Sequence, residues 1–142
     1  MPTPRPLVTL NVPFWFSAWH SLPSRPERHE HTFEVTVSLC GPIAADTGMV
    51  VDILKLQPVL NELRQRVHGK TLNGLAALQD TPAPVNLVAR FPTCETLARY
   101  FAFALPALLE GLIGAEVKLD SITVRLDDQS QELGHAVLRV EG

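Results

Sequence analysis

The chain has 142 residues, and 12 basic residues against 15 acidic ones give it a formal net charge of −3. This charge argues against a nucleic-acid partner, which requires a basic surface, and no apolar run is long enough to cross a bilayer. The first ten residues lack the apolar core of a signal peptide, and the two cysteines, Cys40 and Cys94, form no C-x-x-C pair. We therefore expect a single domain over residues 1–142 in a reduced, cytoplasmic setting.

The first predicted element is a strand over residues 7–20. Apolar side chains occupy its even-numbered positions from Val8 to Ala18, which is the period of a strand with one buried face. Pro13 interrupts the strand, which indicates a bend, a bulge or a sheet edge. His20 is the next residue in the apolar phase. Prolines and serines then predict a loop over residues 21–28.

The second predicted strand covers about residues 31–39, with apolar side chains at odd-numbered positions from Phe33 onward. His29 and His31 fall in the same odd phase. If the two strands pair as a hairpin, His20 at the end of the first lies near both. Zinc favours imidazole, and a catalytic zinc site keeps three protein ligands and one open position. The spacing therefore predicts a zinc site, with hydrogen-bonded polar histidines near a strand end as the alternative.

Two helices are expected next. The first covers residues 56–69, where leucines and a valine form one apolar stripe that ends before a glycine. A long loop over about 74–91 separates it from a second helix, which starts with Thr93 as a possible N-cap and Glu95 in the first turn.

Two further strands, over residues 116–126 and 135–140, close the chain. The order β-β-α-α-β-β predicts an α+β fold, in which two helices pack on one face of an antiparallel sheet.

Five short motifs occur in order between residue 16 and about residue 100: FSAWHSL, HEH, GMVVDILKL, TLN and PTCETLARY. Together they resemble the 6-pyruvoyl-tetrahydropterin synthase family, which includes the 6-carboxy-tetrahydropterin synthases of queuosine biosynthesis. The resemblance implies a T-fold and a zinc-dependent lyase acting on 7,8-dihydroneopterin triphosphate, with His20, His29 and His31 as zinc ligands. It also implies a homohexamer, a dimer of trimers in which each trimer closes a β-barrel.

The chain departs from the family pattern where the family has its catalytic groups. The family base is usually a cysteine a few residues before His-Gly-His, and the nearest carboxylate here is Glu27. Glu27 is therefore the candidate general base, with an exposed loop glutamate as the alternative. His68 stands where the family has the aspartate of an Asp-His pair and is the second candidate catalytic residue. The alternative, which we prefer, is a helix C-terminal histidine followed by the capping Gly69.

Three further residues are implied to bind substrate. Thr93 and Glu95 belong to the PTCE motif, and a carboxylate matches the paired N–H donors of a pterin ring. Asp128 follows the third strand on its apolar face, where the family has a glutamate. First-turn helix electrostatics for Glu95 and a solvated turn acid for Asp128 are the alternatives. Cys94 is expected to pack at the helix start.

Two functions from different classes follow. The first is the zinc-dependent pterin synthase, with Glu27 as the base. The second is a divergent homolog that keeps zinc and a pterin- or purine-like pocket but lacks synthase activity, which the missing thiol and the altered Asp-His pair favour. A zinc-free T-fold protein is a third possibility. Carboxy-, pyruvoyl- and hydroxymethyl-pterin products remain open alternatives.

Overall fold

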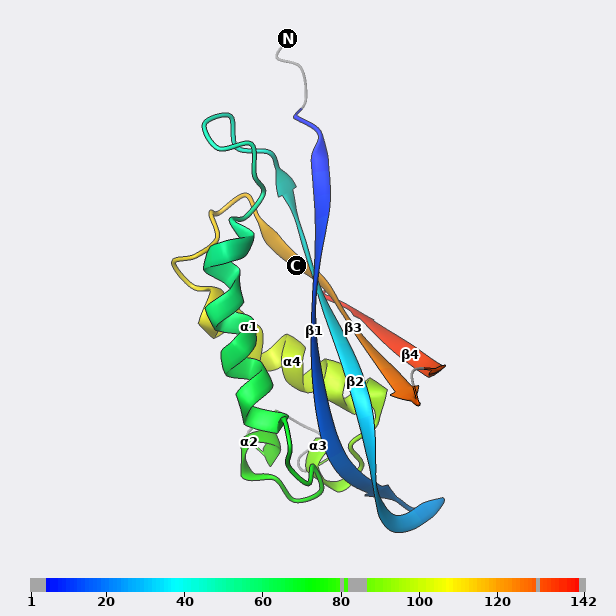
Figure 1. Ribbon diagram of the computed structural model, residues 1–142. Helices are drawn as coiled ribbons and strands as arrows, with labels where there is room; N and C mark the ends of the chain where they lie inside the picture. Colours follow the sequence, from blue (N-terminus) through cyan, green and yellow to red (C-terminus); the bar gives the residue numbers. More distant parts are fainter. Residues whose placement is uncertain (1–4, 80, 82–86, 130, 141–142) are drawn as a thin grey trace.

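A computed structural model describes residues 5–79, 81, 87–129 and 131–140. In this part of the chain four strands form one antiparallel sheet in the order β1-β2-β3-β4, and the helices lie on one side of it (Figure 1). The strands are β1 (Leu7–Leu22), β2 (Arg25–Pro42), β3 (Lys118–Asp128) and β4 (Gln131–Arg139). The helices are α1 (Ile53–Val67), α2 (Ala76–Gln79), α3 (Leu87–Arg90) and α4 (Cys94–Leu109).

This architecture confirms the predicted α+β fold and its element order. The two short helices α2 and α3 lie in the segment predicted as one long loop. No helix in the described ranges is long and apolar enough to span a membrane.

Alternation along β1 and β2 decides which face of the sheet the helices cover. The even positions of β1 from Val12 to His20 and the odd positions of β2 from His31 to Leu39 are buried. Phe16 of β1 stacks on a phenylalanine of β2 with ring centroids 4.9 Å apart. Burying a large apolar side chain of this kind contributes about 1.5–3 kcal/mol. The predicted buried faces of β1 and β2 are therefore correct. At the hairpin end of both strands, histidines continue the apolar face.

Helix starts are fixed by side chains that accept backbone hydrogen bonds. The Asp52 carboxylate accepts the N–H of Leu54 at 3.0 Å before α1, and Thr93 is the N-cap of α4, as predicted. The Thr96 hydroxyl bonds back to the Thr93 N–H at 2.9 Å, which completes a capping box. This box holds the start of α4 in place beside the sheet.

The connection between β1 and β2 is tighter than the sequence indicates. The predicted loop over residues 21–28 is wrong, because β1 continues to Leu22 and β2 begins at Arg25. Only Pro23 and Ser24 form the turn. Proline and serine indicate a chain reversal correctly, but a hairpin turn and a bulge use the same residues as a longer loop.

The hairpin carries a bulge next to the histidines. The register pairs His20 with His29 and Leu22 with Arg25, so residues 26–28 of β2 lie opposite a single residue of β1. A bulge of this kind bends the strand and redirects side chains. The hairpin also projects beyond the paired parts of β3 and β4 (Figure 1).

The outer edge of β1 is partly covered by the segment that follows α1. The Gly69 N–H bonds to the Ser17 carbonyl at 2.6 Å, and Trp19 exchanges backbone hydrogen bonds with Lys70 and Leu72, both at 2.8 Å. Gly69 has a φ of +72°, which a residue without a Cβ adopts without strain. These bonds tie the histidine end of β1 to the helical layer.

Candidate metal centre

Three histidines from the two strands of the hairpin meet on its helix-covered face. The ring centroids of His20 and His29 are 4.5 Å apart, those of His29 and His31 are 4.8 Å apart, and those of His20 and His31 are 5.4 Å apart. One nitrogen from each ring lies within 4.8 Å of the other two, so the group can hold a metal ion. His20 and His31 are 2% and 7% exposed, and His29 is half-buried. The convergence predicted from strand phase is therefore present.

Hydrogen bonds to backbone carbonyls set the tautomers of two of these rings. His20 Nδ1 lies 2.8 Å from the Pro92 carbonyl oxygen, and His29 Nδ1 lies 3.0 Å from that of Glu27. Because a carbonyl oxygen only accepts, each Nδ1 donates its proton, and each Nε2 keeps a free lone pair. This second hydrogen bond is the arrangement that orients metal-binding histidines.

Two nitrogens of the cluster are buried without any hydrogen-bond partner: His20 Nε2 and His31 Nδ1. Buried polar atoms are nearly always paired, because losing water without gaining a partner costs free energy. Both nitrogens belong to rings that lie edge to face in the cluster. Neutral imidazole nitrogens are zinc ligands, so the chemistry of this donor set fits a zinc ion.

Burial also favours the neutral form of these rings. Burial is the largest cause that lowers the pKa of both His20 and His31 below the ordinary value of 6.5. The neighbouring His29 lowers both further by charge repulsion. A metal ligand must be deprotonated, so the environment keeps these imidazoles in the form that binds a cation near neutral pH.

A cavity of about 310 Å³ opens beside the cluster, between the start of α4 and strands β3 and β4. His20, Thr93 and Glu95 line it, so two predicted substrate-binding residues share a cavity with one predicted ligand. Sequence reasoning missed the contribution of β4, whose Leu133, Gly134 and His135 complete the wall. Larger hollows of about 420 and 520 Å³ lie at the other end of the sheet, lined mainly by apolar residues away from the cluster.

Two other residues near this cavity differ in their placement. Asp128 is exposed at the end of β3 and lies outside the cavity lining, although its negative charge is close enough to raise the pKa of His31. Cys94 lines the cavity but is buried, and burial raises the pKa of its thiol to about 11. A thiol in this state is a poor nucleophile, which confirms that Cys94 packs at the helix start.

The candidate base Glu27 lies in the bulge. Its backbone carbonyl holds His29, while its carboxylate is exposed and pairs with Arg25 Nε at 3.2 Å. A hydrogen bond with its own backbone, together with Arg25, lowers the pKa of Glu27, so the side chain is a carboxylate. The structure therefore ties Glu27 to the cluster through its backbone, with the carboxylate at the solvent side.

His68 lies at the C-terminal end of α1, not among the three clustered histidines. Its Nδ1 accepts the N–H of Ser17 at 3.1 Å, and its Nε2 lies 3.3 Å from a nitrogen of Arg64. Gly69 follows in the left-handed conformation. These contacts agree with the helix-terminal interpretation, and the catalytic role of His68 stays a prediction.

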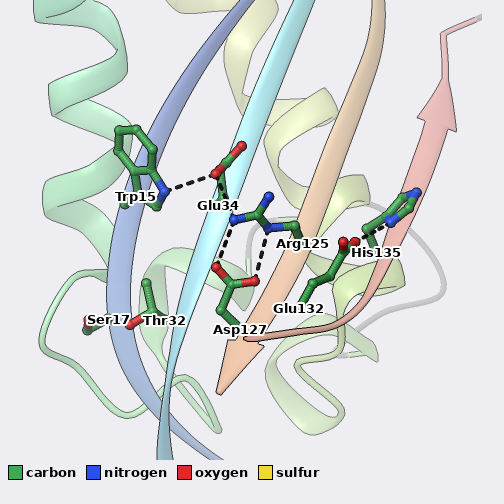
Figure 2. A network of polar contacts seen from close by, with 8 residues as sticks. All are labelled: Trp15, Ser17, Thr32, Glu34, Arg125, Asp127, Glu132 and His135. Carbon is green, nitrogen blue, oxygen red and sulfur yellow. Dashed lines mark hydrogen bonds and ion pairs between the residues drawn. The ribbon is translucent and has the colours of Figure 1, made fainter. Parts of the chain in front are cut away.

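The opposite face of the same sheet carries a paired polar network that the sequence analysis did not identify (Figure 2). Arg125 donates two hydrogen bonds of 2.9 Å to Asp127 and lies 3.2 Å from Glu34, which accepts the Trp15 indole N–H at 3.0 Å. In the register, Trp15, Glu34, Arg125 and His135 form one row across all four strands. Cross-strand neighbours of opposite charge stabilise a sheet, so this row has a structural role.

The sequence profile of the 6-pyruvoyl tetrahydropterin synthase family matches residues 9–132. Among solved structures, the 6-pyruvoyl tetrahydropterin synthase of Caenorhabditis elegans has a TM-score of 0.67 at 18% identity, over 96% of this chain and 98% of that chain. An uncharacterized protein of Wolinella succinogenes has a TM-score of 0.68 at 16% identity, over 96% and 99%. The Plasmodium vivax 6-pyruvoyltetrahydropterin synthase, solved with a catalytic glutamate replaced by alanine, has a TM-score of 0.58 at 15% identity, over 96% and 100%. These similarities extend over nearly the whole fold.

Proposed function

Because the chain belongs to the 6-pyruvoyl tetrahydropterin synthase family, we propose that it is a zinc-dependent lyase acting on 7,8-dihydroneopterin triphosphate. The observation that carries this proposal is the pair of buried, unpartnered nitrogens of His20 and His31 inside a cluster of three imidazoles. Without a ligand at this place, burying those two nitrogens would destabilise the fold, because they lose their hydrogen bonds to water and gain no partner.

In this proposal His20, His29 and His31 hold the zinc ion. The carbonyls of Pro92 and Glu27 keep the rings of His20 and His29 oriented towards it. A zinc ion held there would supply Lewis acidity, which would make C–H protons of the pterin side chain easier to remove.

Glu27 is the proposed general base, since it is the carboxylate bonded through its own backbone to a cluster histidine. A carboxylate within hydrogen-bond reach of a carbon acid can accept its proton. A catalytic glutamate is also named for the Plasmodium vivax synthase, which supports a carboxylate in place of a thiol in this fold. His68 remains a candidate for a second proton-transfer group.

The pterin ring is proposed to enter the cavity at the start of α4. Glu95 is exposed there and free to accept the paired N–H donors of the ring, and Thr93 lines the same wall. Asp128 is proposed to contribute from the end of β3. A cavity of about 310 Å³ is at the small end of the range for ligand sites, which suits a bicyclic heterocycle.

Assembly into a homohexamer of two trimers is proposed because β4 and the start of β1 are open edges of the sheet. Leu7 at the start of β1 is 68% exposed, and Leu133 and Val137 on β4 are 58% and 51% exposed. Strand edges with exposed apolar side chains are sites of pairing with another chain. A cytoplasmic location is proposed because Cys40 and Cys94 are both free thiols.

A divergent homolog that binds zinc but lacks synthase activity is the second candidate. It is favoured by two observations: the Glu27 carboxylate is exposed and paired with Arg25, and both ring nitrogens of His68 have partners within the fold. Its ligand would be a pterin or a purine-like ring in the same cavity.

One experiment separates these candidates. Purified protein is analysed for metal content and then incubated with 7,8-dihydroneopterin triphosphate, and the pterins are separated by chromatography. Stoichiometric zinc with a carboxy-, pyruvoyl- or hydroxymethyl-pterin product supports the synthase and identifies its product. Stoichiometric zinc with tightly bound but unchanged substrate supports the divergent homolog. Protein that binds no zinc contradicts both.

A further inference from the structure

The bulge of β2 carries two arginines with different surroundings. The Arg28 guanidinium lies over the Trp19 ring, 4.4 Å from its centroid, and donates to the Thr71 hydroxyl at 3.0 Å. Trp19 is out of phase with His20 on β1, so Arg28 is directed away from the histidine cluster. Arg28 therefore contributes to the outer side of the hairpin.

Arg25 lies on the cluster side of the bulge. It is the cross-strand partner of Leu22, and Leu22 lines the same cavity as His20. Arg25 is therefore on the same face of the hairpin as Leu22, beside a residue that lines the cavity.

Arg25 is available for another anion. Its ion pair with Glu27, at 3.2 Å, has side chains that are 52% and 67% exposed. Exposed pairs of this kind are weak because water screens both charges. A guanidinium also matches the oxygens of a phosphate group, to which it donates two parallel hydrogen bonds.

We propose that Arg25 binds the phosphate tail of the substrate and makes the site prefer a phosphorylated pterin to its dephosphorylated form. This inference rests on the proposed function, because it assumes that the pterin enters the cavity beside His20. The phosphate takes the place of the Glu27 carboxylate on the guanidinium, so substrate binding releases Glu27 from its ion pair. Arg25 is thus a positioning residue that couples recognition of the phosphate tail to the release of Glu27, the candidate base, from its ion pair.

The test compares Arg25→Gln with Arg28→Gln, which removes the same charge from the same bulge on the side away from the cluster. Binding of inorganic triphosphate to the zinc-loaded proteins is measured by titration calorimetry, with zinc content checked afterwards, because triphosphate itself binds zinc. We expect Arg25→Gln to weaken binding by about tenfold or more, the effect of losing a charge-assisted hydrogen bond, and Arg28→Gln to change it by less than about twofold. Arg25→Lys restores part of the affinity, since a lysine keeps the positive charge but does not donate two parallel hydrogen bonds.

Turnover gives a second readout. The ratio of kcat/KM for dihydroneopterin triphosphate to that for dihydroneopterin falls in Arg25→Gln, mainly through KM of the phosphorylated substrate, and stays constant in Arg28→Gln. Equal triphosphate affinity in the two variants, or an unchanged ratio in Arg25→Gln, overturns the inference.

The inference and the proposed function can fail separately. If no variant forms a pterin product, the proposed function fails, and the triphosphate titration still decides the role of Arg25. If the wild-type protein forms product but triphosphate binding does not depend on Arg25, the proposed function stands and the inference fails.

Discussion

The polar groups on the two faces of the sheet differ in whether they have hydrogen-bond partners. On the helix-covered face, His20 and His31 bury nitrogens that have no hydrogen-bond partner. On the outer face, Arg125 is bonded to Glu34 and Asp127, and the Glu34 carboxylate also accepts the Trp15 N–H. The polar groups of the outer network are paired with one another, whereas the histidine cluster leaves two buried nitrogens without a hydrogen-bond partner in the described part of the chain.

We propose that this difference separates a structural set of polar residues from a functional one. Both sets use cross-strand neighbours: the histidines lie on β1 and β2, and the outer network extends from these two strands to β3. Cross-strand pairing therefore does not distinguish them, and the number of unpaired buried atoms does. Variants in matched pairs, one on each face, test whether the distinction holds.

The largest effect is expected for the histidines. His20→Ala removes a ligand with a buried nitrogen, so stoichiometric zinc and all turnover should be lost. Trp15→Phe, in the polar row on the outer face, should retain both. Elemental analysis of the two purified variants measures the metal. Zinc retained in His20→Ala at the wild-type level would show that the cluster does not bind it.

The glutamates of β2 give the next largest difference. Glu27→Gln should lower kcat by about 100-fold or more while zinc stays bound, because an amide does not accept the proton that a general base removes. Glu34→Gln, on the outer face, should leave kcat within about twofold. Initial rates with dihydroneopterin triphosphate measure both. Full activity in Glu27→Gln excludes that residue as the base.

Removing the metal tests the same comparison through the thermal stability of the protein. A ligand that binds only the folded state stabilises it by about 3–4 kcal/mol when present at several hundred times its Kd. Dialysis against a chelator should therefore lower the Tm of the wild-type protein, and added zinc should restore it. Differential scanning calorimetry measures the shift. The Tm of His20→Ala should not respond to the chelator, and a response there would indicate zinc bound elsewhere.

The smallest effect is expected for the outer network. Asp127→Asn keeps the shape of the side chain but removes the charge that Arg125 meets with two hydrogen bonds. We expect a decrease in Tm of about 2–4 °C, typical of a loss near 1 kcal/mol in a domain of this size, with zinc content unchanged. A loss of zinc in this variant would mean that the two faces are coupled and that the comparison is wrong.

Much of the fold follows from local pattern. Alternation in β1 and β2 predicts the strands, their buried faces and the phase of His20, His29 and His31, because side chains on a strand change face at every residue. The capping role of Thr93 follows equally from residue type. The extent of the hairpin does not, since Pro23 and Pro26 suit a turn, a bulge or a loop alike.

The sequence by itself determined the order of the strands and the two long helices along the chain, the apolar faces and the set of three histidines. The tertiary structure alone decided which nitrogens remain without partners, because the carbonyl of Pro92, 72 residues away along the chain, fixes the ring of His20. It also decided that Arg25 lies opposite Leu22, which lines the cavity, and Arg28 against Trp19. Two arginines three residues apart look alike in a sequence, and only the bulge and the packing around it give them different neighbours.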